Sequence, residues 1–246
     1  MYNTFYDSIA KDYHLKRKKP WIPLKLFLKA LDKNGFQFSG YSIDLGCANG
    51  RNFKLFLKEN IRLIGIDNSL ELLKIANKEM KELEVFSTKQ LKNIQLILSD
   101  ISCLPIRANT IQNIFSIATL HHVKYKIERR KSILQLHDIL KSNGCIILSL
   151  WRKYQKRYKY YFIFDWCKRK FNPKYNKKQQ ILGLKDFGDK FVPWTISQSN
   201  TTYNRFYHFF SNIEIKKLLK QFKIIKIEKL GGPNNKDNFF LLAQKN

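Results

Sequence analysis

The sequence predicts a doubly wound α/β domain with a mostly parallel sheet. Along residues 41–150, segments rich in Ile, Leu and Phe alternate with amphipathic helical segments. Three of the predicted strands end at or just before an acidic residue, namely Asp44, Asp67 and Asp100. Because the carboxyl ends of parallel strands meet at one edge of a sheet, these acids predict a ligand site at that edge.

The predicted elements follow in a regular order. Residues 5–31 are helical, with an interruption at Pro20 and Pro23. Strands are expected at residues 41–44, 62–66, 94–98, 112–118 and 145–150. Helices are expected at 51–58, from a cap at Asn68 or Ser69 to residue 81, and at 127–140. A helix at 213–220 and strands at 224–228 and 239–243 complete the domain.

Composition limits the class of protein. The 246 residues suffice for one large domain or a domain with an insertion. No apolar run reaches membrane-spanning length and no signal peptide is recognisable, so we expect no membrane association and a cytoplasmic location, with the nucleus as an alternative. The four cysteines are scattered, which supports neither a metal site nor a disulfide framework.

The charge points to a polyanionic partner. Lys and Arg number 46 against 19 Asp and Glu, a formal charge of +27. Nucleic acid is the expected partner, and a merely solvated basic surface is the alternative. The basic residues are dense in 151–176, where aromatic residues alternate with them and Asp165 is the only acid. We therefore divide the domain into an N-terminal helical segment (1–40), a ligand-binding core (41–150), a substrate-binding insertion (151–210) and a C-terminal helix with two strands (211–246).

The turn after the first strand reads Gly46-Cys47-Ala48-Asn49-Gly50. Small residues between a strand and a helix let a nucleotide-like ligand approach the backbone. NAD binding is one interpretation, but the GxGxxG pattern is missing. The turn and the three acids resemble the cofactor site of Rossmann-like class I methyltransferases, which have a seven-stranded sheet ending in an antiparallel pair. Glycine is usual where Ala48 stands, and the extra methyl group is compatible with the turn if Ala48 has a negative φ.

That resemblance implies S-adenosylmethionine as cofactor and S-adenosylhomocysteine as product. The loop of Asp44 would bind the methionine part, Asp67 the ribose hydroxyls and Asp100 the adenine amino group, with Ile101 against the ring. The residues that the resemblance assigns to the cofactor are Asp44, Gly46, Cys47, Ala48, Gly50, Asp67, Asn68, Asp100, Ile101 and Ala118.

Three further segments narrow the resemblance: Arg17-Lys18-Lys19-Pro20-Trp21, Phe191-Val192-Pro193-Trp194 and Arg205-Phe206-Tyr207-His208. With the His121-His122 pair they resemble the tRNA methyltransferases that esterify 5-carboxymethyluridine at the wobble position. That family implies binding to the anticodon stem-loop and a small zinc-binding activator subunit. The implied substrate-binding residues are Arg17, Lys19, Trp21, His121, Arg129, Arg130, Trp194, Arg205, Tyr207 and His208.

Several of these residues also have a structural interpretation. Trp194 could pack in a core instead of stacking on a base, Arg129 and Arg130 could be ordinary helix residues, and only one of His121 and His122 is expected to face substrate, with His121 preferred. No residue is assigned as a general base, since a carboxylate is already ionised near neutral pH. Ser116-Ile117-Ala118-Thr119 replaces the Asn/Asp-Pro-Pro-Tyr/Phe motif of amine methyltransferases.

Other functions remain open from the sequence. They are a small-molecule methyltransferase of the same fold, acting on a lipid, a quinone or a carboxylic acid, another tRNA or rRNA methylation, and a tRNA-binding relative without catalytic activity.

Overall fold

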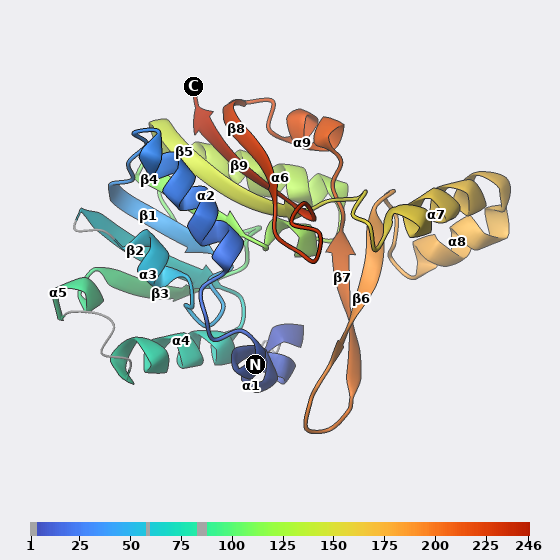
Figure 1. Ribbon diagram of the computed structural model, residues 1–246, viewed down its shortest axis with the longest axis horizontal. Helices are drawn as coiled ribbons and strands as arrows, with labels where there is room; N and C mark the ends of the chain where they lie inside the picture. Colours follow the sequence, from blue (N-terminus) through green and yellow to red (C-terminus); the bar gives the residue numbers. More distant parts are fainter. Residues whose placement is uncertain (1–3, 58–59, 83–87) are drawn as a thin grey trace.

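A seven-stranded sheet forms the centre of the computed structural model, which describes residues 4–57, 60–82 and 88–246 (Figure 1). The strands lie in the order β3-β2-β1-β4-β5-β9-β8. Neighbours from β3 to β5 pair in parallel, and β9 pairs antiparallel with both β5 and β8. The bounds are β1 Gly40–Leu45, β2 Ile61–Asp67, β3 Ile94–Leu98, β4 Ile111–Ile117, β5 Leu140–Trp151, β8 Phe222–Leu230 and β9 Asn238–Lys245.

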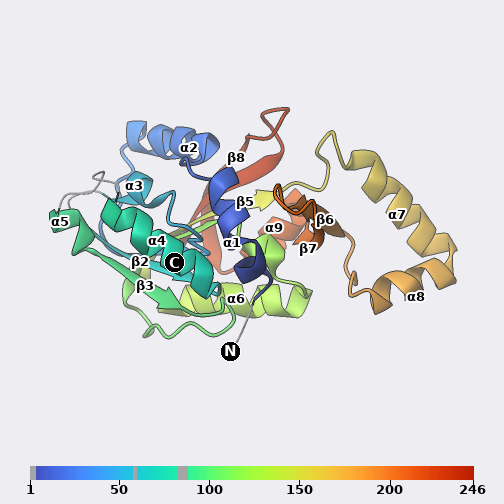
Figure 2. The same ribbon diagram turned by 90° about the horizontal axis from the view of Figure 1, so that it is seen from below.

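Helices cover both faces of this sheet (Figures 1 and 2). Their bounds are α1 Phe5–Lys16, α2 Ile22–Lys33, α3 Phe53–Phe56, α4 Leu70–Glu82, α5 Thr88–Leu91, α6 Lys126–Ile139, α7 Lys159–Phe171, α8 Pro173–Ile181 and α9 Asn212–Leu218, with a 3-10 turn at Leu120–His122.

Alternation along the strands builds two cores. On β4, Ile114 belongs to a cluster that includes residues of α6 and α9, whereas its neighbour Phe115 belongs to a cluster that includes residues of α2, α3 and α4. Successive strand side chains point to opposite faces, so both faces must be apolar when helices cover both. This is why the strand sequences are nearly continuous runs of apolar residues.

The predicted fold class is confirmed, including the antiparallel end of the sheet. Most element boundaries agree with the predicted ones within two residues. The helix expected at 51–58 is shorter, Phe53–Phe56, and residue 58 lies outside the described residues. The strand expected at 145–150 is longer, because pairing with β4 starts at Leu140 and resumes at Cys145 after an irregularity.

The insertion contains regular structure that the sequence patterns did not reveal. Helices α7 and α8 form a hairpin that projects from the body of the molecule (Figures 1 and 2). Strands β6 (Asp189–Thr195) and β7 (Thr202–His208) form a separate antiparallel hairpin. Among the described residues, no helix is both long and apolar enough to cross a membrane.

Candidate active site

A cavity of about 1430 Å³ opens at the carboxyl ends of the parallel strands. The chain passes from β3 on one side of β1 to β4 on the other, so the loops after β1 and β4 diverge and leave a crevice between them. Helix α1, the segment after it and the β6–β7 hairpin supply further parts of the wall. The predicted ligand edge of the sheet is therefore the site of this cavity.

The turn after β1 packs closely against the start of the loop after β4. Gly46 has φ +72°, and a Cβ built on it would lie 2.2 Å from Oγ1 of Thr119. The Thr119 hydroxyl in turn donates a hydrogen bond to the Leu45 carbonyl over 2.9 Å. Only glycine fits this position, because both its backbone conformation and its surroundings exclude a side chain.

Ala48 does not have the negative φ that its methyl group would favour. Its φ is +51°, between the positive-φ residues Gly46 and Gly50. The conformation lets the Ala48 amide donate a 2.8 Å hydrogen bond to Oδ2 of Asp67. The turn therefore forces an L-residue into the left-handed region, where glycine is normally preferred.

The three strand-end acids differ in their surroundings. Asp44 is 1% exposed, and its Oδ2 has no hydrogen-bond partner among the described residues. Burial, together with the charge of Asp67, raises the pKa of Asp44 to about 8. Asp67 accepts hydrogen bonds from the amides of Ala48 and Ser69, yet burial still raises its pKa to about 6. Asp100 is exposed and accepts from the amide and hydroxyl of Ser102.

These features fit a cofactor that carries hydrogen-bond donors and a positive charge. A buried carboxylate oxygen without a donor is costly, and a ligand donor would remove that cost. Most of the predicted cofactor residues line the cavity: Gly46, Cys47, Ala48, Asp67, Asn68, Asp100, Ile101 and Ala118. Asp44 and Gly50 do not line it; Asp44 lies buried at the end of β1, and Gly50 packs against Phe53.

The segment after α1 is attached to the cofactor turn. The Asn49 side chain donates to the Arg17 carbonyl over 3.0 Å, and the Trp21 amide donates to Oδ1 of Asn52 over 3.2 Å. Arg17, Lys19 and Trp21 all line the cavity, as predicted for substrate-binding residues. Sequence reasoning assigned no role to Asn49, although an amide beside a tight turn is a signal for such an attachment.

The two histidines differ in a way that supports the preference for His121. His122 contacts the Phe206 carbonyl over 3.1 Å through Nδ1 and the Tyr6 hydroxyl over 3.0 Å through Nε2. His121 stacks on Tyr207 and has no hydrogen-bond partner at Nδ1 among the described residues. Burial lowers the pKa of both, that of His122 to about 3, so both imidazoles are neutral near pH 7.

Arg205 is one of the cations that line the cavity, and its guanidinium lies against two aromatic rings. Its guanidinium carbon lies 4.6 Å from the ring centre of Trp194 and 5.1 Å from that of Tyr207. No acidic partner is found for it in the described part of the chain, and its buried Nε has no hydrogen-bond acceptor. A partly buried guanidinium without an acidic partner favours an anionic ligand such as a carboxylate.

Trp194 is already packed on its own protein. It is 7% exposed, its indole N–H donates to Asp12 over 2.8 Å, and Tyr13 stacks on its ring. With Arg205 also against the ring, the structural interpretation of Trp194 is the better one, although part of the residue lines the cavity.

Three predicted substrate-binding residues lie away from the cavity wall: Arg129, Arg130 and His208. Arg129 is 2% exposed and binds the carbonyls of Val123 and Lys124 and the carboxylate of Asp186. Arg130, the next residue on α6, is exposed.

His208 is directed away because it follows the cavity-lining Tyr207 in a strand. It bridges Asp189 and Glu214, each at 2.6 Å. Asp186, Asp189 and His208 lie near enough together to suit a metal ion, but ion pairs to Arg129 and Glu214 already use these groups.

Comparison with known proteins agrees with this geometry. Residues 43–148 match the family model described as "Methyltransferase domain". The chain is 25% identical to a tRNA (carboxymethyluridine(34)-5-O)-methyltransferase of Schizosaccharomyces pombe, over 98% of this chain and 94% of that protein. A protein of the same name from Arabidopsis thaliana is 28% identical over 61% of this chain, and the match covers 32% of the plant protein.

Solved structures share the fold. An S-adenosylmethionine-dependent methyltransferase from Methanosarcina mazei superposes with a TM-score of 0.67 at 18% identity, over 87% of this chain and 96% of that one. A Burkholderia thailandensis N1-methyltransferase solved with S-adenosylhomocysteine gives a TM-score of 0.59 at 15% identity, over 97% of this chain and 84% of that one. The chain thus has the fold of the S-adenosylmethionine-dependent methyltransferases, contains a segment that matches the methyltransferase domain model, and resembles the tRNA (carboxymethyluridine(34)-5-O)-methyltransferases along nearly its whole length.

Proposed function

We propose that this enzyme esterifies the carboxylate of 5-carboxymethyluridine at wobble position 34 of tRNA. The products are 5-methoxycarbonylmethyluridine and S-adenosylhomocysteine. The structural observation that carries the proposal is the unpaired guanidinium of Arg205 in the cavity, beside two neutral histidines. The similarity to the S. pombe protein along nearly the whole of both chains supports the same substrate.

The cofactor would occupy the strand-end part of the cavity. Asp44 and the turn at Gly46 would hold the methionine part, Asp67 the ribose and Asp100 with Ile101 the adenine. When bound, S-adenosylmethionine supplies a methyl group on a positively charged sulfur. The unpartnered Oδ2 of Asp44 and the lack of room for a side chain at Gly46 support this placement.

The chemistry requires positioning more than proton transfer. A carboxylate is ionised near pH 7, so it needs no general base. A cofactor held at the turn of Gly46 would supply its methyl carbon to one carboxylate oxygen, and its sulfur would keep the electron pair of the bond that breaks. Arg205 binds the other oxygen, since a strong contact to the attacking oxygen would stabilise the ground state as its charge is lost. The neutral His121 bounds the pocket without adding charge.

The cations at the cavity mouth would bind phosphates. Arg17 and Lys19 are exposed and line the cavity. Exposed cations of this kind contribute a sequence-independent affinity for the tRNA backbone. Arg17→Ala is expected to weaken tRNA binding and to leave the chemical step at least as fast. Loss of the chemical step with unchanged tRNA affinity would contradict a phosphate role.

We further propose a small zinc-binding activator subunit as partner and the cytoplasm as the compartment. Among the described residues, one edge of the outer strand β3 has no partner strand, and its last residue Leu98 is exposed, which suits the addition of a strand from another chain. All four cysteines are unpaired thiols, which suits a reducing compartment. Full activity and cofactor affinity of the isolated chain would contradict dependence on an activator.

The type of bond formed gives a direct test of the reaction class. Methyl esters are cleaved by mild alkali, whereas methyl groups on base nitrogen or carbon are not. We expect label transferred from S-adenosyl[methyl-³H]methionine to tRNA to be released as volatile methanol by mild alkali. Label that stays on the tRNA after this treatment would show a different methylation.

A further inference from the structure

Helix α7 is apolar on two opposite faces. Its inner face packs on the insertion, where the ring of Phe162 lies 5.0 Å from that of Phe209. On the other side, Tyr160, Ile163, Phe164 and Phe171 are exposed by 66%, 41%, 62% and 74%. We call these four residues, with Cys167 between them, the outer stripe. Their spacing of three or four residues places them on one side of the helix.

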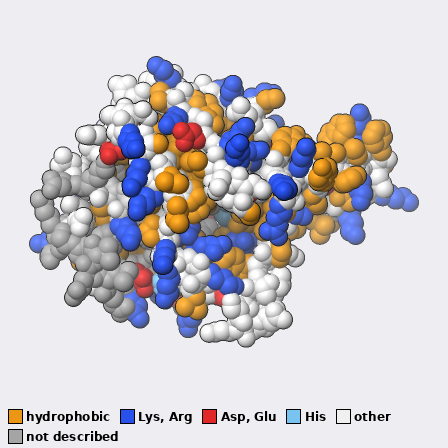
Figure 3. Space-filling view, in the orientation of Figure 1, with side chains coloured by type: hydrophobic (Ala, Val, Ile, Leu, Met, Phe, Trp, Pro, Cys, Tyr) orange, Lys and Arg blue, Asp and Glu red, His pale blue; other side chains and the backbone are white. Residues whose placement is uncertain are grey.

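The outer stripe is not needed for folding of the helix. One apolar face is enough to attach an amphipathic helix to a protein. A second, solvent-facing stripe of large side chains marks a surface that binds something. On the projecting hairpin, hydrophobic side chains and Lys or Arg side chains lie together at the surface (Figure 3).

The charges beside the stripe require an anionic occupant. Lys159, Lys168 and Lys170 flank it on α7, and Lys174, Lys177 and Lys178 follow on α8; all six are exposed, and none has an acidic partner in the described part of the chain. The one acid of the hairpin, Asp165, is already paired with Arg169 at 2.7 Å. The Lys170 ammonium lies 5.2 Å from the Trp166 ring centre and 5.4 Å from that of Phe171.

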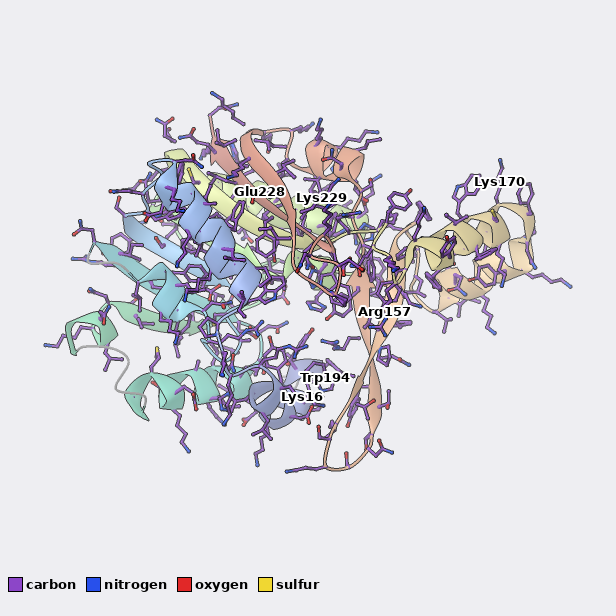
Figure 4. The ribbon with its side chains drawn as sticks, viewed as in Figure 1. Lys16, Arg157, Lys170, Trp194, Glu228 and Lys229 are labelled. Atoms are coloured by element: carbon purple, nitrogen blue, oxygen red, sulfur yellow. The ribbon has the colours of Figure 1, made fainter. Side chains whose placement is uncertain are left out.

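The helix that carries the stripe starts close to the cavity. Arg157 lines the cavity and precedes the start of α7 by two residues. Figure 4 shows Arg157 near the junction of body and hairpin and Lys170 farther out on the hairpin. At about 1.5 Å per residue, Phe164 lies roughly 8 Å along the helix from its first residue. A strand entering the cavity can therefore extend along α7.

We propose that the outer stripe binds the tRNA, with unpaired bases near the modified nucleotide stacked on Tyr160, Phe164 and Phe171. Lys168 and Lys170 bind the adjoining phosphates. This inference rests on the proposed function, because the tRNA is the anionic molecule expected at the cavity. Aromatic rings alternating with lysines suit single-stranded nucleic acid, since every base has a face that can stack.

The test measures tRNA affinity directly. Fluorescence anisotropy with a labelled tRNA transcript that has uridine at the wobble position compares the wild-type chain with F164S/F171S and K168E/K170E. Stacking of a single base corresponds to about fivefold or more in affinity, so the stripe variant is expected to bind tRNA at least about tenfold more weakly. The lysine variant is expected to show weaker binding with a shallower salt dependence.

Matched controls change other exposed residues: L26S/I225S for apolar side chains and K216E/K220E for lysines. Unchanged S-adenosylmethionine affinity shows that each variant is folded. Ultraviolet cross-linking of tRNA to the peptide 159–171 would support the proposal independently.

Unchanged tRNA affinity of both test variants would overturn the inference. If the two test variants keep their tRNA affinity but lose binding to vesicles of acidic phospholipid, the inference is overturned and the stripe is a membrane-binding surface. The proposed function fails separately: if the wild-type chain forms no methyl ester while F164S/F171S still loses tRNA affinity, the tRNA surface stands and the reaction assignment falls.

Discussion

At the scale of single residues, the sequence predicts chemistry better than conformation. Asp44, Asp67 and Asp100 were identifiable because each lies at or just after the end of an apolar run, and the fold then brings such positions to one edge. The φ of Ala48 was not predictable, because it depends on hydrogen bonding between its amide and Asp67 across two strands. The sequence predicts Arg205 as a site residue. Its lack of an acidic partner becomes visible only in the folded structure, where its neighbours are known.

Ala48→Gly is expected to stabilise the protein or leave its stability unchanged. Glycine lowers the free energy of unfolding by roughly 0.5–1 kcal/mol, because it makes the unfolded chain more flexible. The left-handed conformation costs an L-residue about 1–2 kcal/mol, and removing this cost offsets that loss. The measurement is the free energy of unfolding in urea. Ala30→Gly, in the interior of α2, is the control and should lose about 1 kcal/mol. Equal losses for the two variants would refute strain at Ala48.

Asp44→Asn is expected to stabilise the cofactor-free protein at high pH and to weaken cofactor binding. Burial raises the pKa of Asp44 in the folded state to about 8, whereas its pKa in the unfolded state is near 4. Below about pH 4 the Asp44 carboxyl is protonated in both states, so burying it costs no stability through ionisation. Between about pH 4 and 8 the unfolded state loses its proton first, and wild-type stability falls as pH rises. The advantage of Asn should therefore reach about 1 kcal/mol or more near pH 8.

Urea unfolding at about pH 4 and pH 8 and calorimetric titration with S-adenosylmethionine check both parts. Asp138→Asn, on the exposed side of α6, is the control and should change neither quantity. An Asp44→Asn variant that binds the cofactor as well as the wild-type chain does would contradict the assignment of Asp44.

Arg205→Gln is expected to lower kcat/KM for tRNA about tenfold or more without changing cofactor affinity. A charge-assisted hydrogen bond contributes about 1.5–3 kcal/mol, which sets this scale. Steady-state kinetics with tRNA containing 5-carboxymethyluridine give the value. Arg130→Gln alters an exposed arginine outside the cavity and should behave like the wild-type enzyme. Equal effects of the two substitutions would argue against a carboxylate at Arg205.

At the scale of elements, the attachment of the β6–β7 hairpin to α1 completes the site. Asp12 accepts hydrogen bonds from the Trp194 indole and the Ser197 amide and pairs with Lys16 at 2.8 Å. Figure 4 shows Lys16 beside Trp194. Trp194 and Ser197 lie 182 and 185 residues from Asp12 in the sequence, so no local pattern predicts these two contacts. The individual motifs were recognisable, but the hairpin that unites them was not.

Asp12→Asn is expected to loosen the hairpin tip. Burial alone would raise the pKa of Asp12, but hydrogen bonds from Lys16, Ser197 and Trp194 hold it at about 2. A depressed pKa stabilises the fold above the unfolded value near 4, and that stabilisation is lost as pH falls toward 2. Hydrogen exchange of residues 192–202 should therefore accelerate in the variant near pH 7.

The stability difference from the wild-type chain should shrink between about pH 4 and pH 2 as the wild-type carboxylate is protonated. Unchanged exchange at the tip near pH 7 would show that other contacts hold the hairpin.

At the scale of the whole molecule, the sheet was predictable and the insertion was not. The central parallel strands contribute side chains to the cores on both faces of the sheet, which produces the apolar runs that reveal them. In the insertion, α7 is apolar on two sides, so no single helical stripe stands out against a polar face. The net charge of +27 predicted a polyanion as partner, and the cations of the α7–α8 hairpin now mark a specific surface for it.

The most direct test of the account is nucleoside mass spectrometry of tRNA containing 5-carboxymethyluridine at position 34. The tRNA is incubated with S-adenosylmethionine and this chain, co-expressed with a zinc-binding activator of the family. Wobble 5-carboxymethyluridine is expected to be converted to its methyl ester, and Asp44→Ala is expected to abolish the conversion. Persistence of the free carboxylate, despite measurable binding of both S-adenosylmethionine and tRNA, would contradict the proposed reaction.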